Sequence, residues 1–486
     1  MRSAHSHLAA GDSSKTSSGG TERFVVRLIC AWLIIQPWLI GGVFWWSEAL
    51  NATVGLVCLV AALRLKENRR ALWRFPVFWL GLLFCGYVLC QAVNAWGYAV
   101  QRVPTALMYD LYKKDYVSWL PSGVGGNYLQ PCTWRTFVFW LAPWLLVCAW
   151  WAAVRRRRSG RIFSLVVFLN GIVMAAVVIY ERFHPPTKIL WFYSFPDLDP
   201  HSTQFASFVD HNKAAALLSL LMGTGFVVAG RLQARAQAQA RDTGLTWVAL
   251  FGCLIIFASF FSLGSRAGLA VACGVFVGGL VILILARLLA KDYSPGLWLG
   301  SLMLFAAVAG VGVFEFIHRD SGTWGRVVYL HEHPEEVDTR EILRQETIHM
   351  IKARFWLGWG GGSYRYVSPN FFMEEVYAWH DTRFPDGLSV QSDWAHSDWL
   401  QLPMEFGMIG AGLLLAILFS LYGRALWLSR RLGAAGFAAL LACAGTMAHA
   451  VVDFPMYNAS ILAVFSILLV STVKNAELES RHESKS

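Results

Sequence analysis

Long apolar segments alternate with short polar ones along most of the chain. Most of these apolar segments have about 17–25 residues, enough for a helix to cross roughly 30 Å of hydrocarbon. The pattern predicts twelve membrane-spanning helices, at residues 24–46, 49–63, 75–93, 135–154, 162–180, 214–230, 245–262, 267–287, 297–314, 403–423, 433–452 and 457–473. The second segment is short for a full crossing, so its ends are the least well defined. We therefore expect an all-α polytopic membrane protein.

The composition supports a membrane protein. Hydrophobic residues make up 56% of the 486 residues and charged residues only 15%, against about 25% charged residues in a typical soluble chain. The 23 tryptophans fit as well, because tryptophan gathers at bilayer interfaces. The first 22 residues are polar and rich in Ser and Gly, which predicts a disordered tail. No cleavable signal peptide is expected, because the first apolar segment is long and lacks a small-residue cleavage site.

The basic residues predict the orientation. They concentrate in short clusters between apolar segments: RLKENRR (64–70), RRRRSGR (155–161), RLQARAQAQAR (231–241) and RALWLSRR (424–431). Such clusters mark cytoplasmic loops, so topology explains the net charge of +10 better than a nucleic-acid partner does. The expected order is a cytoplasmic tail (1–22), nine spans (23–314), a large periplasmic loop (315–402), three spans (403–473) and a second cytoplasmic tail (474–486).

Three shorter segments also face outward in this topology, at residues 94–134, at 181–213 and at the turn GSRAG (264–268). Within the large loop, residues 338–355 have apolar positions compatible with an amphipathic helix, which GWGGG (358–362) then ends.

Several polar residues stand out on the outer side: Arg266, Arg326, Arg340, Arg344, His396, Asp398 and Asp453. Arg266 lies in the short turn between two spans, where an arginine is costly unless it meets water or an anion. It is either an interface residue whose stem follows the apolar surface or a cation that binds a ligand. In the second case the backbone N–H groups that open the next helix would help to hold a phosphate.

His396 directly precedes the tenth predicted span. It is either an interface residue beside a helix cap formed by Ser397 or Asp398, or part of a site.

Neither a metal site nor a nucleotide site is predicted. The two histidines of HEHPEE (331–336) lie on a proline-containing loop, with no second cluster at ligand spacing. GWGGG lacks the lysine of a P-loop and follows no strand. Of the nine cysteines, only Cys132 lies in a long outer loop, so no disulfide framework is expected there.

Three sequence motifs carry a resemblance to a known family. His396 and Ser397, followed by nine residues and GMIG (407–410), resemble the His-[Asn/Ser/Gln]-x9-Gly-x-x-Gly motif of the O-antigen ligase family. Arg340 followed by FWLGWGGGSY (355–364) is similar to its Arg…Pro-Leu-Leu-Gly-x-Gly-x-Gly-x-Phe segment, with Phe and Tyr in place of the Pro and the final Phe. SLGSRAG (262–268) resembles its Ser-Arg-Gly turn, with Ala for Gly.

Two further segments, HNKAAALL (211–218) and HAVVDFPMYN (449–458), also resemble segments of this family. The resemblance covers about residues 200–470.

The resemblance implies a GT-C-type glycosyltransferase that uses neither metal nor cofactor. Family members take a glycan from undecaprenyl pyrophosphate at the periplasmic face of the inner membrane. They transfer it to lipid A-core, to a growing polysaccharide or to a protein hydroxyl, and the sequence leaves these three acceptors open. The resemblance assigns catalysis to His396, Arg340 and Arg266, and substrate binding to Arg344, Arg326, His211, Asn212 and Asp398.

The chemistry of these side chains agrees with that assignment. Guanidinium groups stay charged and bind phosphate oxygens in pairs, which suits a pyrophosphate leaving group. A neutral histidine can take the proton of an acceptor hydroxyl, and Asp398 or Asp393 would orient it. A glycolipid or anion transporter is the rival of another class. It would place polar residues in mid-span, whereas these lie at the outer ends of spans. A scaffold would tolerate the loss of Arg266 or His396.

Overall fold

The computed structural model describes residues 2–101, 109–193, 205–239, 244–291, 310, 339–371 and 394–483. At residues 2–18, 109, 339–342 and 481–483 it describes the backbone alone.

Ten helices in these ranges are long and apolar enough to cross a membrane. They are α2 (Trp45–Leu63), α4 (Pro76–Val93), α5 (Thr133–Ala153), α6 (Arg157–Phe183), α7 (His211–Ala238), α8 (Gly244–Leu263), α9 (Arg266–Leu289), α15 (Asp398–Trp427), α16 (Ser429–Val452) and α17 (Ala459–Glu483). These helices match the second to eighth and the tenth to twelfth predicted spans, which confirms the all-α polytopic fold. The predicted ninth span, 297–314, lies outside the described residues apart from Gly310.

The first predicted span differs from the helix that is present. Helix α1 (Arg2–Trp38) ends well before residue 46, and the short helix η1 (Ile40–Gly42) follows it. The chain turns here through Gly41 and Gly42, whose φ angles are 65° and 75°, and such angles favour glycine. A Cβ on Gly41 would lie only 2.6 Å from the ring of Phe208. Close packing against a distant segment therefore ends the first span, and the hydrophobic pattern does not record that packing.

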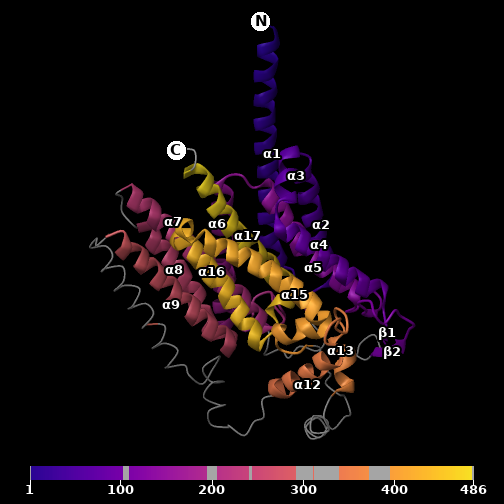
Figure 1. Cartoon of the computed structure of the whole chain (residues 1–486). Helices are drawn as coiled ribbons and strands as arrows, with labels where there is room; N and C mark the ends of the chain where they lie inside the picture. Colours follow the sequence, from indigo (N-terminus) through magenta and orange to yellow (C-terminus); the bar gives the residue numbers. More distant parts are fainter. Residues whose placement is uncertain are drawn as a thin grey trace.

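The segment predicted as a disordered tail, residues 1–22, forms the first part of α1 from Arg2 onward. This part of the helix projects beyond the rest of the bundle (Figure 1). A helix satisfies its own backbone hydrogen bonds, so it can continue past the last helix that packs against it.

The central helices of the bundle are α7 and α17. In the most apolar 18-residue stretch of each helix, 83% and 89% of the residues are buried. Helix α7 packs on α6, α8, α9 and α16, whereas α5 packs on α2, α4 and α17. In the most apolar 18-residue stretch of α9, only 28% of the residues are buried. Its remaining apolar surface lies on the outside of the bundle, as expected of a helix that faces lipid.

Both chain ends lie at one end of the bundle, and the small extramembrane elements lie at the other (Figure 1). The predicted outer loop 94–134 forms a small sheet in which β1 (Gly97–Gln101) pairs antiparallel with β2 (Tyr109–Lys113) and parallel with β3 (Val124–Gly125). The predicted amphipathic helix is α12 (Thr339–Ala353), and α13 (Tyr364–Val367) follows the glycine segment. An even number of spans predicts that the termini share one end.

Candidate active site

His396 lies in a strained backbone conformation just before α15. Its φ angle is 48°, a left-handed value that is uncommon for residues other than glycine and concentrates at functional sites. Hydrogen bonds on both sides hold this conformation. The N–H of Ala395 donates to Oε1 of Gln401 (3.0 Å), and the N–H of Asp398 donates to the carbonyl of Asp453 (3.1 Å). Ser397 makes no side-chain capping bond, so the geometry does not support a simple helix cap.

The imidazole of His396 has a carboxylate on one side. Its Nδ1 lies 3.7 Å from Oδ1 of Asp453, which is buried. The Nδ1 atom is itself buried, yet 30% of the side chain is exposed. The edge of the Phe454 ring packs against the imidazole, with ring centroids 5.1 Å apart. A carboxylate facing Nδ1 favours the tautomer that carries its proton there, which leaves Nε2 to accept a proton.

Among the described residues, the carboxylate beside the histidine is Asp453, which was not one of the two predicted from sequence to orient it. Asp398 is buried, and its Oδ2 accepts a hydrogen bond of 2.8 Å from the N–H of Met456. Asp393 lies outside the described residues. Asp453 ends α16, so it meets His396 only because α15 and α16 are antiparallel neighbours. The sequence signal available for it was the segment HAVVDFPMYN, which resembles a family segment without indicating a partner.

Lys213 places a positive charge near His396, over the ring of Phe454. Its Nζ lies 4.4 Å from the ring centroid of Phe454 and 5.4 Å from that of Trp394. These two rings stack with centroids 5.0 Å apart and planes 9° from parallel. A cation over aromatic faces is held electrostatically and retains its charge for a further ligand. The segment HNKAAALL resembles a family segment, but its sequence alone does not distinguish Lys213 from its neighbours.

Asn212, next to Lys213, joins α7 to the turn that carries Arg266. Its buried side chain accepts a hydrogen bond of 2.6 Å from Oγ of Ser265. Ser265 in turn caps α9 by accepting from the N–H of Gly268 at 3.0 Å. Asn212, predicted to bind substrate, thus has a structural partner, whereas Arg266 is exposed directly after the cap. His211 begins α7 and is half-buried.

Arg344 lies on α12 beside the end of α16. Its Nη2 donates a hydrogen bond of 3.4 Å to the carbonyl of Val451, two residues before Asp453. Arg340 lies one turn before Arg344 on the same helix. Residues four apart share a helix face. The side chain of Arg340 lies outside the described part, as does the whole of Arg326. Helix α12 therefore brings Arg344 to the end of α16, and Arg340 lies one turn earlier on the same helix.

Residues 251–415 match the family model described as O-antigen ligase. The match supports the O-antigen ligase family for this part of the chain. It includes Arg266, Arg340, Arg344 and His396, whereas Lys213 and Asp453 lie outside the matched residues. No curated protein matches the chain. The match supports a glycosyltransferase-like role of the ligase or polymerase kind, in a multi-pass membrane protein.

The glycines of the O-antigen ligase motifs have a structural role. Helix α15 leaves helical geometry at Gly407 (φ 62°, ψ −179°), and the segment 358–362 packs into that break. The N–H of Gly360 donates to the carbonyl of Glu405 at 2.7 Å. A Cβ on Gly407 would lie 2.2 Å from the carbonyl oxygen of Trp356. The two motifs therefore meet backbone to backbone, which fixes the segment that follows α12 against the first part of α15.

A second carboxylate stabilises this junction. Glu405 is fully buried and accepts hydrogen bonds from Gln401 Nε2 (3.0 Å) and from the Tyr457 hydroxyl (2.8 Å). Burial and the neighbouring carboxylate raise the pKa of Tyr457 well above its usual value, so this phenol remains a hydrogen-bond donor. Gln401 also binds the Ala395 N–H, which connects the junction to the backbone at His396.

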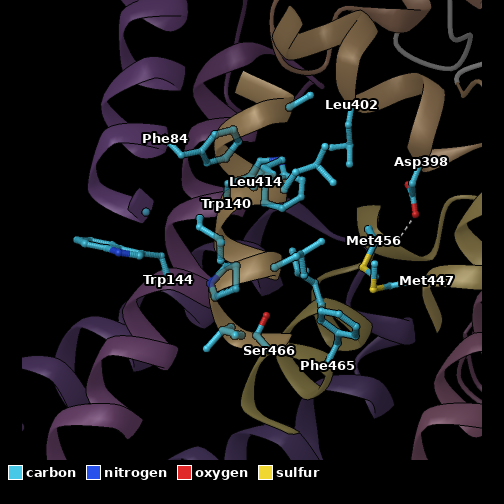
Figure 2. A pocket seen from close by; sticks show the side chains of 18 of the residues that line it. Phe84, Trp140, Trp144, Asp398, Leu402, Leu414, Met447, Met456, Phe465 and Ser466 are labelled. Atoms are coloured by element: carbon cyan, nitrogen blue, oxygen red, sulfur yellow. Dashed lines mark hydrogen bonds between the residues drawn. The ribbon is translucent and has the colours of Figure 1, made fainter. Parts of the chain in front are cut away.

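An apolar cavity of about 260 Å³ lies between the helices near this junction. Aromatic and aliphatic side chains of α4, α5, α15, α16 and α17 line it, among them Phe84, Trp140, Trp144, Leu402, Leu414, Met447 and Phe465 (Figure 2). Asp398 is the one charged residue in this lining, and Figure 2 shows its carboxylate directed at Met456. Its Oδ1 is buried and makes no hydrogen bond within the described chain.

The described residues contain no group of three or more His, Cys, Asp or Glu side chains placed to hold a metal ion. HEHPEE lies outside the described residues. Metal independence therefore stays a prediction.

Proposed function

We propose that this protein transfers a glycan from undecaprenyl pyrophosphate to an acceptor hydroxyl at the periplasmic face of the bacterial inner membrane. The observation that carries the proposal is the pairing of His396 with Asp453 at the start of α15. The cation Lys213 lies close to this pair, over the ring of Phe454. The Nδ1 atom of the imidazole is buried beside a carboxylate and 30% of the side chain is exposed, which suits a general base.

In this reaction the acceptor hydroxyl attacks the anomeric carbon of the donor glycan. The hydroxyl proton passes to Nε2 of His396, a new glycosidic bond forms, and the bond to the pyrophosphate oxygen breaks. The leaving undecaprenyl pyrophosphate keeps that electron pair, so negative charge grows on it. Arg266 and Arg340 are the proposed guanidinium groups that stabilise this charge, because fixed donors aimed at developing charge lower the barrier most effectively.

Lys213 and Arg344 add two positive charges near His396 and Asp453. Lys213 lies over the ring of Phe454, which itself contacts His396. Arg344 reaches the carbonyl of Val451 at the end of the helix that carries Asp453. These contacts bring two positive charges to the neighbourhood of the base. They support binding of the pyrophosphate or of an anionic sugar at this place.

The apolar cavity supports a lipid-linked donor. Its lining is almost wholly hydrocarbon and aromatic, and at one end it reaches Asp398, two residues from His396. A volume of about 260 Å³ is large enough for part of a polyprenyl chain. A transporter is the less favoured alternative, because His396, Arg266 and Lys213 all lie at the ends of spans and not in their middle.

The proposed acceptor is a hydroxyl of lipid A-core, of a growing polysaccharide or of a protein, and the same proton transfer applies to each of these alternatives. The test uses cells that lack the gene and carry either wild-type protein or His396→Gln at matched expression. We expect the variant to accumulate the lipid-linked glycan and to lose the corresponding surface or protein-bound glycan. His184→Gln is the control, because His184 is an exposed histidine beyond the outer end of α6. Wild-type transfer by His396→Gln would refute the proposal.

A further inference from the structure

A basic pocket lies at the end of the bundle that carries both termini, opposite the proposed active site. It has a volume of about 420 Å³ and opens between α6, α7, α16 and α17. Its charged lining residues are Arg157, Arg161, Arg231, Arg430, Arg431 and Glu479. Glu479 is the one acid among them, and it already pairs with Arg157 at 2.8 Å. Four positive charges in excess therefore surround one concave site.

Arg231 is fixed at this site by neutral partners. Its Nη1 donates to the carbonyl of Gly160 (2.8 Å) and to Oγ of Ser164 (3.2 Å). Among the described residues it makes no ion pair, so its charge is positioned without being neutralised. A guanidinium held in this way keeps other donors free for a ligand, since it carries five N–H groups.

The backbone adds a further positive end. Helix α16 leaves helical geometry at Gly433 (φ 56°, ψ −175°) and restarts directly afterwards. The first turn of the restarted helix, residues 434–436, lines the pocket. A Cβ on Gly230 would lie 2.9 Å from the backbone nitrogen of Ala435, so the glycine lets α7 approach this turn closely. A helix start combined with convergent arginines is a site for an anion.

Topology alone does not account for this arrangement. The preference for basic residues on one side of a membrane places arginines in loops, but it does not require loops far apart in the sequence to converge on one cavity. Like charges that converge repel each other unless a counter-ion lies between them. The pocket also has apolar lining, including Leu432 and Ala476, and it opens where several spans end. A headgroup phosphate lies at this depth when its acyl chains are in the bilayer.

We propose that this pocket binds the phosphate group of an anionic phospholipid, at a site separate from the proposed transfer reaction. Basic pockets between the ends of membrane helices recognise such headgroups by charge and by guanidinium hydrogen bonds.

The test is native mass spectrometry of the full-length protein, delipidated and then incubated with phosphatidylglycerol or with zwitterionic phosphatidylcholine. The variant is Arg161→Gln with Arg430→Gln, because both residues are exposed in the pocket rim. The matched control is Arg64→Gln with Arg69→Gln, two exposed arginines that remove the same charge and do not line this pocket. Arg231→Gln alone is a second variant, which removes the positioned guanidinium.

We expect retention of phosphatidylglycerol to fall about fivefold for each pocket arginine removed, with little change in the control pair or in phosphatidylcholine. Equal losses in the pocket variant and the control would overturn the proposal, because net charge alone would then explain binding. Displacement of the lipid by a low concentration of inorganic phosphate would also overturn it, in favour of a soluble anion site. Unchanged lipid retention in both pocket variants is the third contradicting result.

Discussion

Nδ1 of His396 lies 3.7 Å from Oδ1 of Asp453, although the whole of α15 and α16 separates the two residues along the chain. This distance is longer than a hydrogen bond but close enough for the carboxylate to set the orientation and tautomer of the imidazole. Such contacts often shorten when substrate binds. The relationship leads directly to the first prediction.

Asp453→Asn keeps the size of the side chain but removes its charge. We expect the rate of transfer to fall by about 10²-fold or more, because an amide no longer stabilises the protonated imidazole or selects its tautomer. The measurement is transfer from a lipid-linked donor by purified protein. Asp115→Asn, on an exposed aspartate two residues after β2, is the control. Full activity in Asp453→Asn would show that His396 acts without an orienting carboxylate.

Lys213→Gln tests the positive charge near His396. The lysine lies over Phe454 and Trp394, and the variant removes its charge. We expect about a tenfold weaker apparent affinity for the lipid-linked donor, since a charge-assisted contact is worth roughly 1.5–3 kcal/mol. Lys188→Gln, in the exposed segment that follows α6, controls for general loss of charge. An unchanged KM for the donor would exclude Lys213 from donor binding.

The two arginines of α12 are expected to respond differently to lysine. Arg340→Lys should be nearly as damaging as Arg340→Ala, at about 10²–10³ in rate, because lysine lacks the planar fork that binds two phosphate oxygens. Arg344→Lys should be tolerated, since its hydrogen bond to the Val451 carbonyl needs only one donor. Purified variants are compared at equal expression. A larger loss at 344 than at 340 would move the phosphate-binding role to Arg344.

Gly407→Ala is expected to destabilise the fold. The added Cβ would lie 2.2 Å from the Trp356 carbonyl oxygen, and alanine would also have to adopt the positive φ of this position. The left-handed backbone alone costs about 1–3 kcal/mol. Gly412→Ala on the same helix is the matched control, because nothing lies within 4 Å of its Cβ position. The readout is the thermal stability of the detergent-purified protein, and equal stability of the two variants would contradict the packing described for Gly407.

Transfer by the purified protein is expected to survive EDTA. The predicted charge stabilisation comes from arginine guanidinium groups, which need no divalent ion. The assay uses protein in nanodiscs, so that the chelator cannot act through damage to an outer membrane. Loss of transfer that a divalent ion restores would replace the arginine mechanism with a metal-assisted one.

The sequence by itself determined the membrane-spanning helices, because hydrophobic length is a local property that each helix carries alone. It also indicated His396, through a motif, and α12, through its apolar periodicity. The packing of the helices against one another decided which residues surround His396. The contact between His396 and Asp453 depends on how α15 and α16 dock, and no spacing along the chain encodes it. The same holds for Lys213 on Phe454 and for the insertion of residues 358–362 at Gly407. Asn212 was predicted to bind substrate, but in the packed structure its side-chain oxygen accepts a hydrogen bond from Ser265, which precedes α9. These relationships are long-range because side chains and backbone groups find their partners only after helices far apart in the chain have packed together.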